Sequence, residues 1–148
     1  MPIPVYIKEG DLEFDSDPER IPWSLLMEYV HNCYWSPNRS LEVMQDAVRN
    51  SFFLACYDKG QLAGYCRMVT DYTTFGWLCD VYVHHPWRGQ GISKRLMELI
   101  TTHPEFSRMK RILLITKDAH GLYKQFGYET LTEPDKWMVR DQRNSMRV

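Results

Sequence analysis

The sequence has no hydrophobic run of the roughly 20 residues that a membrane-spanning helix needs. Its first residues, Met1 to Tyr6, lack the positive charge and the apolar stretch of a signal peptide. An excess of charge is missing as well, since 18 lysines and arginines balance 19 aspartates and glutamates. This balance argues against a nucleic-acid-binding domain, which needs a strongly basic surface, and against a polybasic membrane-binding patch.

Cysteines are few, and their spacing argues against two kinds of site. No two of the four cysteines show the close spacing of zinc-binding and CxxC redox motifs. We therefore expect no metal site. Scattered thiols in a chain of 148 residues favour a cytoplasmic protein with reduced cysteines over a disulfide framework.

The sequence does have enough apolar residues for one hydrophobic core. Its 44% hydrophobic and 14% aromatic residues exclude a disordered chain. A length of 148 residues fits one ordinary domain, and no internal repeat, linker or low-complexity tract divides it. We therefore expect a single domain over residues 1–148.

The spacing of apolar residues predicts the secondary structure. In the N-terminal part it predicts a strand at 5–7, a loop at 11–20, a helix opening at Pro22, a helix capped by Ser40, and strands at 52–57, 61–70 and 75–83. In the C-terminal part it predicts a helix at 91–102, a buried central strand at 112–116, a helix at 119–126, and a final pair of strands at 128–131 and 137–140. This order favours an α+β, or mixed α/β, architecture.

The segment from Leu78 to Ser93 is the most informative part of the chain. An apolar strand enters a turn that contains Gly89 and Gly91, and the turn leads directly into a helix. Glycines allow a ligand to approach the backbone, and the first turn of a helix presents unpaired N–H groups. The segment therefore suits a phosphate or pyrophosphate, although a plain strand-to-helix turn has the same pattern. It matches neither the dinucleotide-binding fingerprint nor the P-loop.

Two blocks in this region resemble the GNAT superfamily of acyl-CoA-dependent N-acetyltransferases. The family's signature, Gln/Arg-x-x-Gly-x-Gly/Ala, is similar to Arg88-Gly89-Gln90-Gly91-Ile92-Ser93. Its second block, Asn-x-x-Ala-x-x-Leu-Tyr-x-x-x-Gly-Phe, is similar to residues 116–128, with Thr116 in place of Asn and Tyr128 in place of Phe. The resemblance implies the GNAT fold: a mixed, mostly antiparallel sheet of about six or seven strands flanked by about four helices.

The resemblance also implies how acetyl-CoA would bind. The backbone of Val81, Tyr82 and Val83 would pair with the pantetheine arm like an added strand, which requires an open edge beside a bulge. Backbone N–H groups from Gly89 to Lys94 would hold the pyrophosphate. The other residues that the resemblance places at the acetyl-CoA site are Arg88, Gln90, Gly91, Ile92, Ser93, Thr116, Ala119 and Tyr123.

Two residues are candidates for catalysis. Tyr123 matches the family's tyrosine that gives a proton to the departing thiolate, and a phenol with a pKa near 10 is neutral at pH 7; the alternative is a core tyrosine. Asp80 interrupts an apolar run and matches an acidic residue of polyamine acetyltransferases in the superfamily. It would hold the acceptor's ammonium group or relay its proton, and the alternative is a hydrogen-bonded strand residue.

Three aromatic residues in predicted loops, Tyr34, Trp35 and Tyr72, would line a pocket for an apolar or aromatic amine, or else pack the loops onto the core.

We expect acetyl transfer from acetyl-CoA to a primary amine of a small molecule by direct attack on the thioester. We expect no metal, nucleic-acid or membrane partner, and a monomer or homodimer. Two alternatives stay open: an acetyltransferase that acts on a protein lysine or N-terminus, and a CoA-binding sensor without catalysis.

Overall fold

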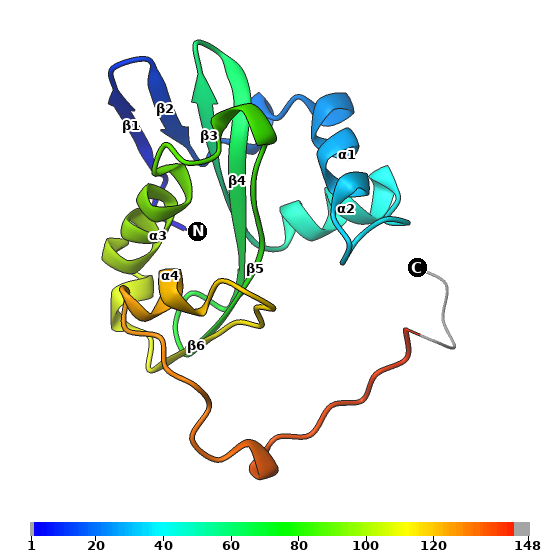
Figure 1. The fold of residues 1–148 in the computed structure, drawn as a ribbon, viewed down its shortest axis with the longest axis vertical. Coiled ribbons are helices and arrows are strands. Elements are labelled where there is room, and N and C mark those ends of the chain that lie inside the picture. The colour runs from blue at the N-terminus through cyan, green and yellow to red at the C-terminus, as the bar shows by residue number, and fades with distance from the viewer. Residues whose placement is uncertain (1, 144–148) are drawn as a thin grey trace.

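The computed structural model describes residues 2–143, and within them six strands form one sheet in the order β1-β2-β3-β4-β5-β6 (Figure 1). The strands are β1 Tyr6–Glu9, β2 Leu12–Asp15, β3 Phe52–Asp58, β4 Gln61–Thr70, β5 Phe75–Val83 and β6 Arg111–Leu113. The first five strands pair antiparallel, and β6 runs parallel to β5. The α-helices of the described residues are α1 Trp23–Asn32, α2 Leu41–Arg49, α3 Ile92–Thr102 and α4 His120–Lys124. The predicted mixed α/β fold is confirmed.

Helices cover both faces of the sheet. α1 and α2 pack on one face, and α3 and α4 on the other (Figure 1). Alternate residues of β3 serve the two cores: Leu54 and Cys56 face α3, whereas Ala55 and Tyr57 face α1 and α2. A strand that is covered on both faces has no polar alternation, which explains the continuous apolar run in this part of the sequence.

The loop predicted at 11–20 is wrong in part, because Leu12–Asp15 forms β2 between β1 and β3. Its charges concealed the strand, since acidic residues alternate with Leu12 and the fully buried Phe14. Arg20 binds the acidic side chains on the outer face, Glu13 at 3.0 Å and Asp15 at 3.2 Å. Glu13 and Asp15 of the acidic run are therefore the polar, partly buried face of a strand.

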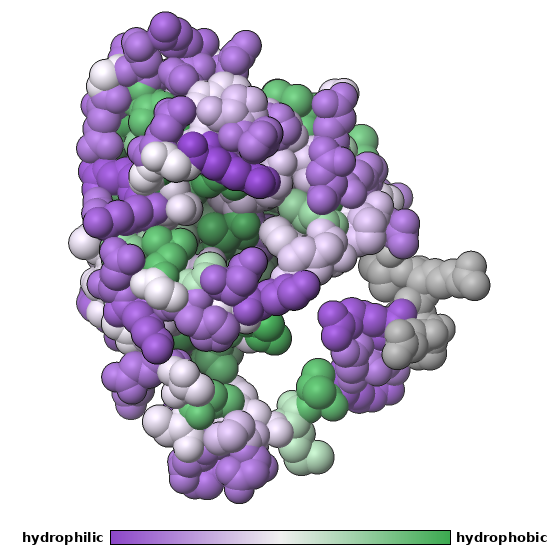
Figure 2. Space-filling model, viewed as in Figure 1, coloured by the Kyte–Doolittle hydropathy of each residue, from purple (hydrophilic) through white to green (hydrophobic). Residues whose placement is uncertain are grey.

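The C-terminal third differs most from the prediction. The strand predicted as central at 112–116 is wrong, because β6 is a short strand at the edge of the sheet and Ile115 is 83% exposed. The final strand pair at 128–131 and 137–140 is also wrong, since no strand pairing includes these residues in the described chain. The C-terminal segment leaves the rest of the protein after α4 (Figure 1). In the space-filling view an open gap separates part of this segment from the helices and the sheet (Figure 2). Its apolar side chains therefore stay exposed: Leu131, Trp137, Met138 and Val139.

The helix boundaries follow the predicted signals more closely. Ser40 caps α2, and its side chain accepts a hydrogen bond from the backbone N–H of Val43 at 3.2 Å. Gly91 precedes α3 in the left-handed conformation. Within residues 2–143, no helix combines the length and the apolar composition that crossing a membrane requires.

Candidate active site

A cleft of about 720 Å³ opens where β5 and β6 separate. The two strands pair only between Phe75–Trp77 and Arg111–Leu113, so within the described chain the rest of β5 has no partner on this side. The cleft lies between this free edge, the turn before α3, the start of α4 and the loop between α1 and α2. The open strand edge that the sequence resemblance requires is therefore present.

A β-bulge at Asp80 shapes the middle of β5. Tyr82 pairs with Tyr65 and Cys79 with Arg67, so two residues of β5 lie opposite the single residue Cys66 of β4. Asp80 has a φ of 51°, in the left-handed region that non-glycine residues rarely adopt. The bulge places the Asp80 side chain in the wall of the cleft, where it is 8% exposed.

One end of the cleft is built from backbone groups; we call it the glycine end, residues 81–83 and 89–94. Gly89 and Gly91 both have a φ of 80°. None of the backbone N–H groups of residues 89–94 donates a hydrogen bond to another group of the described chain. The first turn of α3 carries no acidic side chain. Unpaired donors at the positive end of a helix form a site for an anion.

Arg88 and the strand end hold the glycine end together. The Arg88 Nε donates to the Val83 carbonyl oxygen at 2.9 Å, which ties the turn to β5. The His84 N–H donates to the Ala63 carbonyl of β4 at 2.8 Å. Successive residues of a strand turn their N–H groups to opposite sides, so the N–H of Val83 faces the cleft.

Tyr123 of α4 lies in the wall of the cleft, 8% exposed. Burial raises the pKa of Tyr123 to about 12, so the phenol keeps its proton at neutral pH. Its ring packs edge-on against Tyr128 at a centroid distance of 5.9 Å. Thr116 positions the helix, because its Oγ1 accepts a hydrogen bond from the Ala119 N–H at 3.0 Å.

The other end of the cleft is built from side chains; we call it the arginine end, residues Trp35, Arg39, Arg67 and Asp80. Arg39 Nη1 and Arg67 Nε each donate to Asp80 Oδ2 at 2.8 Å, and Trp35 Nε1 donates to Asp80 Oδ1 at 3.2 Å. Burial alone would raise the pKa of the Asp80 carboxyl, but the positive charges of Arg67 and Arg39 outweigh it and hold that pKa below its ordinary value.

Most of the predicted site residues lie along this one cleft. Those that line it are Tyr34, Trp35, Asp80, Val81, Tyr82, Val83, Arg88, Gly89, Gly91, Ile92, Ser93, Thr116, Ala119 and Tyr123. Gln90 and Lys94 are exposed beside the turn and do not line the cleft. Tyr72 is not brought to the cleft at all: its ring stacks on Phe106 at 6.2 Å and packs against the core under α3.

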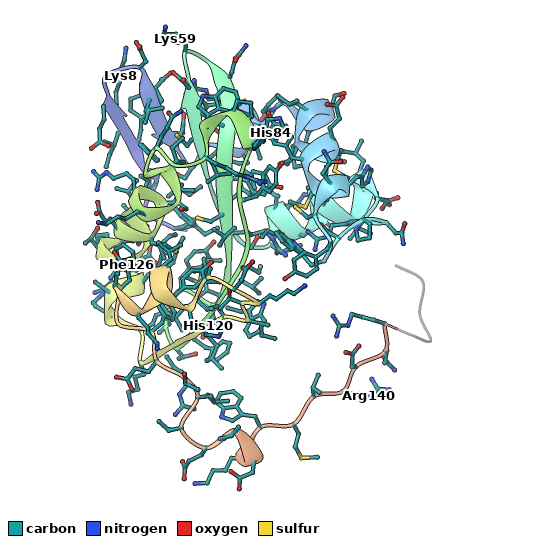
Figure 3. All side chains as sticks on the ribbon, viewed as in Figure 1. Lys8, Lys59, His84, His120, Phe126 and Arg140 are labelled. Carbon is teal, nitrogen blue, oxygen red and sulfur yellow. The ribbon has the colours of Figure 1, made fainter. Side chains whose placement is uncertain are left out.

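Sequence reasoning missed Arg39 and Arg67. Arg67 interrupts the buried strand β4 as Asp80 interrupts β5, so an unpaired charge in each of two apolar strands was an available signal. Arg39 lies in the loop before α2, and no pattern marks it. His84 does not line the cleft, because its ring stacks on that of Tyr29 in α1 at a centroid distance of 4.1 Å. Figure 3 shows His84 on the side of the sheet where α1 lies.

A family model described as "Acetyltransferase (GNAT) domain" matches residues 49–130, more than half of the chain. The chain belongs to the GNAT acetyltransferase family. The match contains β3 to α4, and therefore the whole glycine end and Tyr123. Enzymes of this family use acetyl-CoA. Within residues 2–143, no group of three or more histidine, cysteine, aspartate or glutamate side chains is placed to hold a metal ion.

Individual relatives agree with this assignment. A GNAT-family structure from Xanthomonas campestris pv. campestris is 29% identical, with a TM-score of 0.86 over 90% of this chain and 95% of that one. The Gibberella zeae protein "Putative acetyltransferase FG08082" is 25% identical over an alignment that covers 85% of this chain and 84% of the relative. A Clostridium acetobutylicum structure solved with acetyl-CoA is 13% identical and shares the fold, with a TM-score of 0.65 over 90% of this chain and 97% of that one.

Proposed function

We propose that this GNAT acetyltransferase transfers the acetyl group of acetyl-CoA to a primary amine of a small-molecule acceptor. One observation carries the proposal: a single cleft is lined by the free edge of β5, by Gly89 and residues 91–93 with their unpaired N–H groups, and by the neutral phenol of Tyr123. These are a surface for an extended amide chain, a site for phosphates and a proton donor. Together they fit the donor acetyl-CoA.

The glycine end would hold acetyl-CoA through its backbone. The free edge of β5 at Val81–Val83 offers peptide groups to the amides of the pantetheine arm, as in strand addition. The unpaired N–H groups of residues 89–94 fit the pyrophosphate. Because the φ of Gly89 and Gly91 is positive, other residues there would be strained and would hinder close approach.

Acetyl-CoA when bound supplies the thioester carbonyl carbon that the amine attacks. The Val83 N–H faces the cleft and would stabilise the negative charge that develops on the carbonyl oxygen. Tyr123 would donate its proton to the sulfur as the thiolate leaves. The proximity of Tyr123 and the β5 edge in one cleft supports both roles.

The contacts of Asp80 favour a supporting role over that of a base. Both arginines already occupy its Oδ2, and a lowered pKa makes the carboxylate a weak proton acceptor. We therefore propose that water in the cleft, and not Asp80, accepts the amine proton. We further propose that the enzyme is cytoplasmic, because all four cysteines are free thiols. We also propose that it is a monomer or a homodimer.

The test is acetyl-CoA binding by calorimetry, followed by release of free CoA thiol with a panel of small primary amines. Binding with amine-dependent thiol release would support the proposal, and a reaction without amine measures background hydrolysis. Turnover on peptides alone would move the assignment to a protein acetyltransferase. Binding with no turnover on any amine or peptide would indicate a CoA sensor. Absence of binding would contradict the proposal.

A further inference from the structure

The arginine end of the cleft holds more positive than negative charge in a buried place. Two guanidinium groups, of Arg39 and Arg67, share one carboxylate oxygen of Asp80. The side chains are 20%, 12% and 5% exposed, respectively. One carboxylate compensates one guanidinium, so the cluster keeps one excess positive charge in the wall of the cleft.

The surroundings do not cancel this charge. The basic residues that line the cleft are Arg39, Arg67, Arg88, Lys117 and Arg143, and the acidic ones are Asp80 and Asp118. Arg143 is paired with Asp141, and Lys117 lies over the Tyr34 ring at 5.6 Å. Asp118 is exposed and forms no ion pair in the described chain. The cleft is thus positive although the chain's net charge is −1.

Both arginines also keep free hydrogen-bond donors. Beyond Asp80, Arg39 Nη1 contacts the Met44 sulfur and Arg67 Nη1 contacts Ser51 Oγ, each at 3.4 Å. In the described chain, Nη2 of both residues and Nε of Arg39 have no partner. None of these nitrogens is sealed from solvent, and both side chains line the cleft. Unused guanidinium donors therefore remain accessible at the arginine end.

Such a cluster suits an anion. A buried charge without a partner is costly, and a guanidinium fork fits the oxygens of a carboxylate or a phosphate. A second ammonium group on the acceptor would instead meet the excess positive charge. Asp80 holds the two guanidiniums side by side, and Trp35 fixes the other oxygen of the carboxylate. Asp80 is thus a positioning residue.

We propose that the acceptor amine carries an anionic group, a carboxylate or a phosphate, which Arg39 and Arg67 bind. The inference rests on the proposed acetyl transfer and names its substrate class. An acceptor anchored by its anionic group at the arginine end has its amine elsewhere in the same cleft, which Tyr123 also lines. The polyamine class suggested by the position of Asp80 is disfavoured.

The first experiment compares matched acceptors with the full-length protein. Amino acids are compared with their amides, phosphoethanolamine with ethanolamine, and spermidine serves as the polycation. We expect the kcat/KM of an anionic acceptor to exceed that of its neutral partner at least about tenfold, which corresponds to about 1.4 kcal/mol. The carboxylate and phosphate pairs identify the anion. Equal or better turnover of the neutral partners, or of spermidine, would overturn the inference.

Variants of an arginine before α2 and of one within α2 test which residue binds the anion. We expect Arg39→Gln to raise the KM for the anionic acceptor, with unchanged affinity for acetyl-CoA. The ratio of kcat/KM between the anionic acceptor and its neutral partner, the preference, should then fall close to one. Arg39→Lys should recover part of the preference. The matched control is Arg49→Gln, since Arg49 is exposed, pairs with Asp46 and does not line the cleft. Full preference in a folded Arg39→Gln protein, verified by its melting curve, would overturn the inference.

A binding measurement separates this inference from the proposed function. If acetyl-CoA binds but no amine is acetylated, the proposed function fails, and succinate and inorganic phosphate are titrated into the CoA-saturated protein. Saturable binding that Arg39→Gln abolishes and Arg49→Gln keeps would establish the anion site by itself. Absence of saturable binding would overturn it.

Discussion

The two ends of the cleft bind by different means. At the glycine end the binding groups belong to the backbone and come from one segment, residues 81–94. At the arginine end they are side chains from separate segments: the loop before α2, β4 and β5. A backbone site depends on local conformation, whereas a side-chain site depends on the tertiary fold. We therefore expect changes at the glycine end to lower the affinity for acetyl-CoA by the same factor whichever acceptor is used. Changes at the arginine end should instead alter which acceptor the enzyme prefers.

Tyr123→Phe should have the largest effect, because it removes the proposed proton donor of the cleft. We expect kcat to fall about 1,000-fold, within the range for loss of a general acid, with acetyl-CoA affinity unchanged. Steady-state kinetics and calorimetry measure the two quantities. Tyr128→Phe is the control, since Tyr128 is a neighbouring tyrosine that does not line the cleft. An unchanged kcat in Tyr123→Phe would remove Tyr123 from the mechanism.

Asp80→Asn should break the arginine end and spare the glycine end. It leaves two buried guanidiniums without a counter-charge, so we expect a loss of about 3 kcal/mol in unfolding free energy at pH 7. Asp46→Asn is the control. Its expected loss of unfolding free energy is at most about 1 kcal/mol, because Asp46 pairs with Arg49 on the surface. Urea unfolding measures both.

The pH dependence of the Asp80→Asn effect follows from the lowered pKa of Asp80. A carboxyl whose pKa is depressed in the folded state contributes stability above its unfolded pKa and loses it as the pH falls. The difference in unfolding free energy between wild type and Asp80→Asn should therefore become smaller once the pH falls below 3.8, the ordinary pKa of an aspartate carboxyl. A difference that is constant from pH 7 to pH 3 would contradict the buried ion pair.

Gly91→Val should weaken the glycine end and spare the arginine end. The left-handed conformation at Gly91 strains other residues by about 1–2 kcal/mol, and the added side chain would block approach to the backbone. We expect an acetyl-CoA affinity about 100-fold lower, or about 2.7 kcal/mol, by calorimetry. Gly60→Val is the control, because Gly60 has a φ of 83° in the turn between β3 and β4. Equal losses of affinity in both variants would indicate strain alone.

Trp35→Phe should have the smallest effect, since it removes one hydrogen bond to Asp80 and leaves an aromatic ring at this position. A hydrogen bond to a charged group contributes about 1.5 kcal/mol, so the KM for the acceptor should rise about tenfold at most. The expected signature is a change in KM without a change in kcat. A change in acetyl-CoA affinity instead would show that the two ends are coupled.

The glycine end was predictable from sequence because its determinants are contiguous. Gly89 and Gly91 mark a turn before a helix, and that local pattern also fixes the positive φ values and the unpaired N–H groups. At the arginine end, Asp80 and Trp35 were predicted one by one, but the cluster was not, because only the pairing of β4 with β5 brings Arg67 to Asp80. The C-terminal strands failed for a related reason: the apolar residues near Trp137 have a strand-like pattern but no partner within the described chain.

The most direct test of the backbone site is amide hydrogen exchange with and without CoA. We expect CoA to slow exchange of the amides of residues 89–94 and of Val83, because the N–H groups of residues 89–94 have no partner in the described chain and the Val83 N–H faces the cleft. The hairpin of β1 and β2 lies outside the cleft and should be unaffected. Saturating CoA without any slowing at residues 89–94 would contradict the assignment of the glycine end as the binding site.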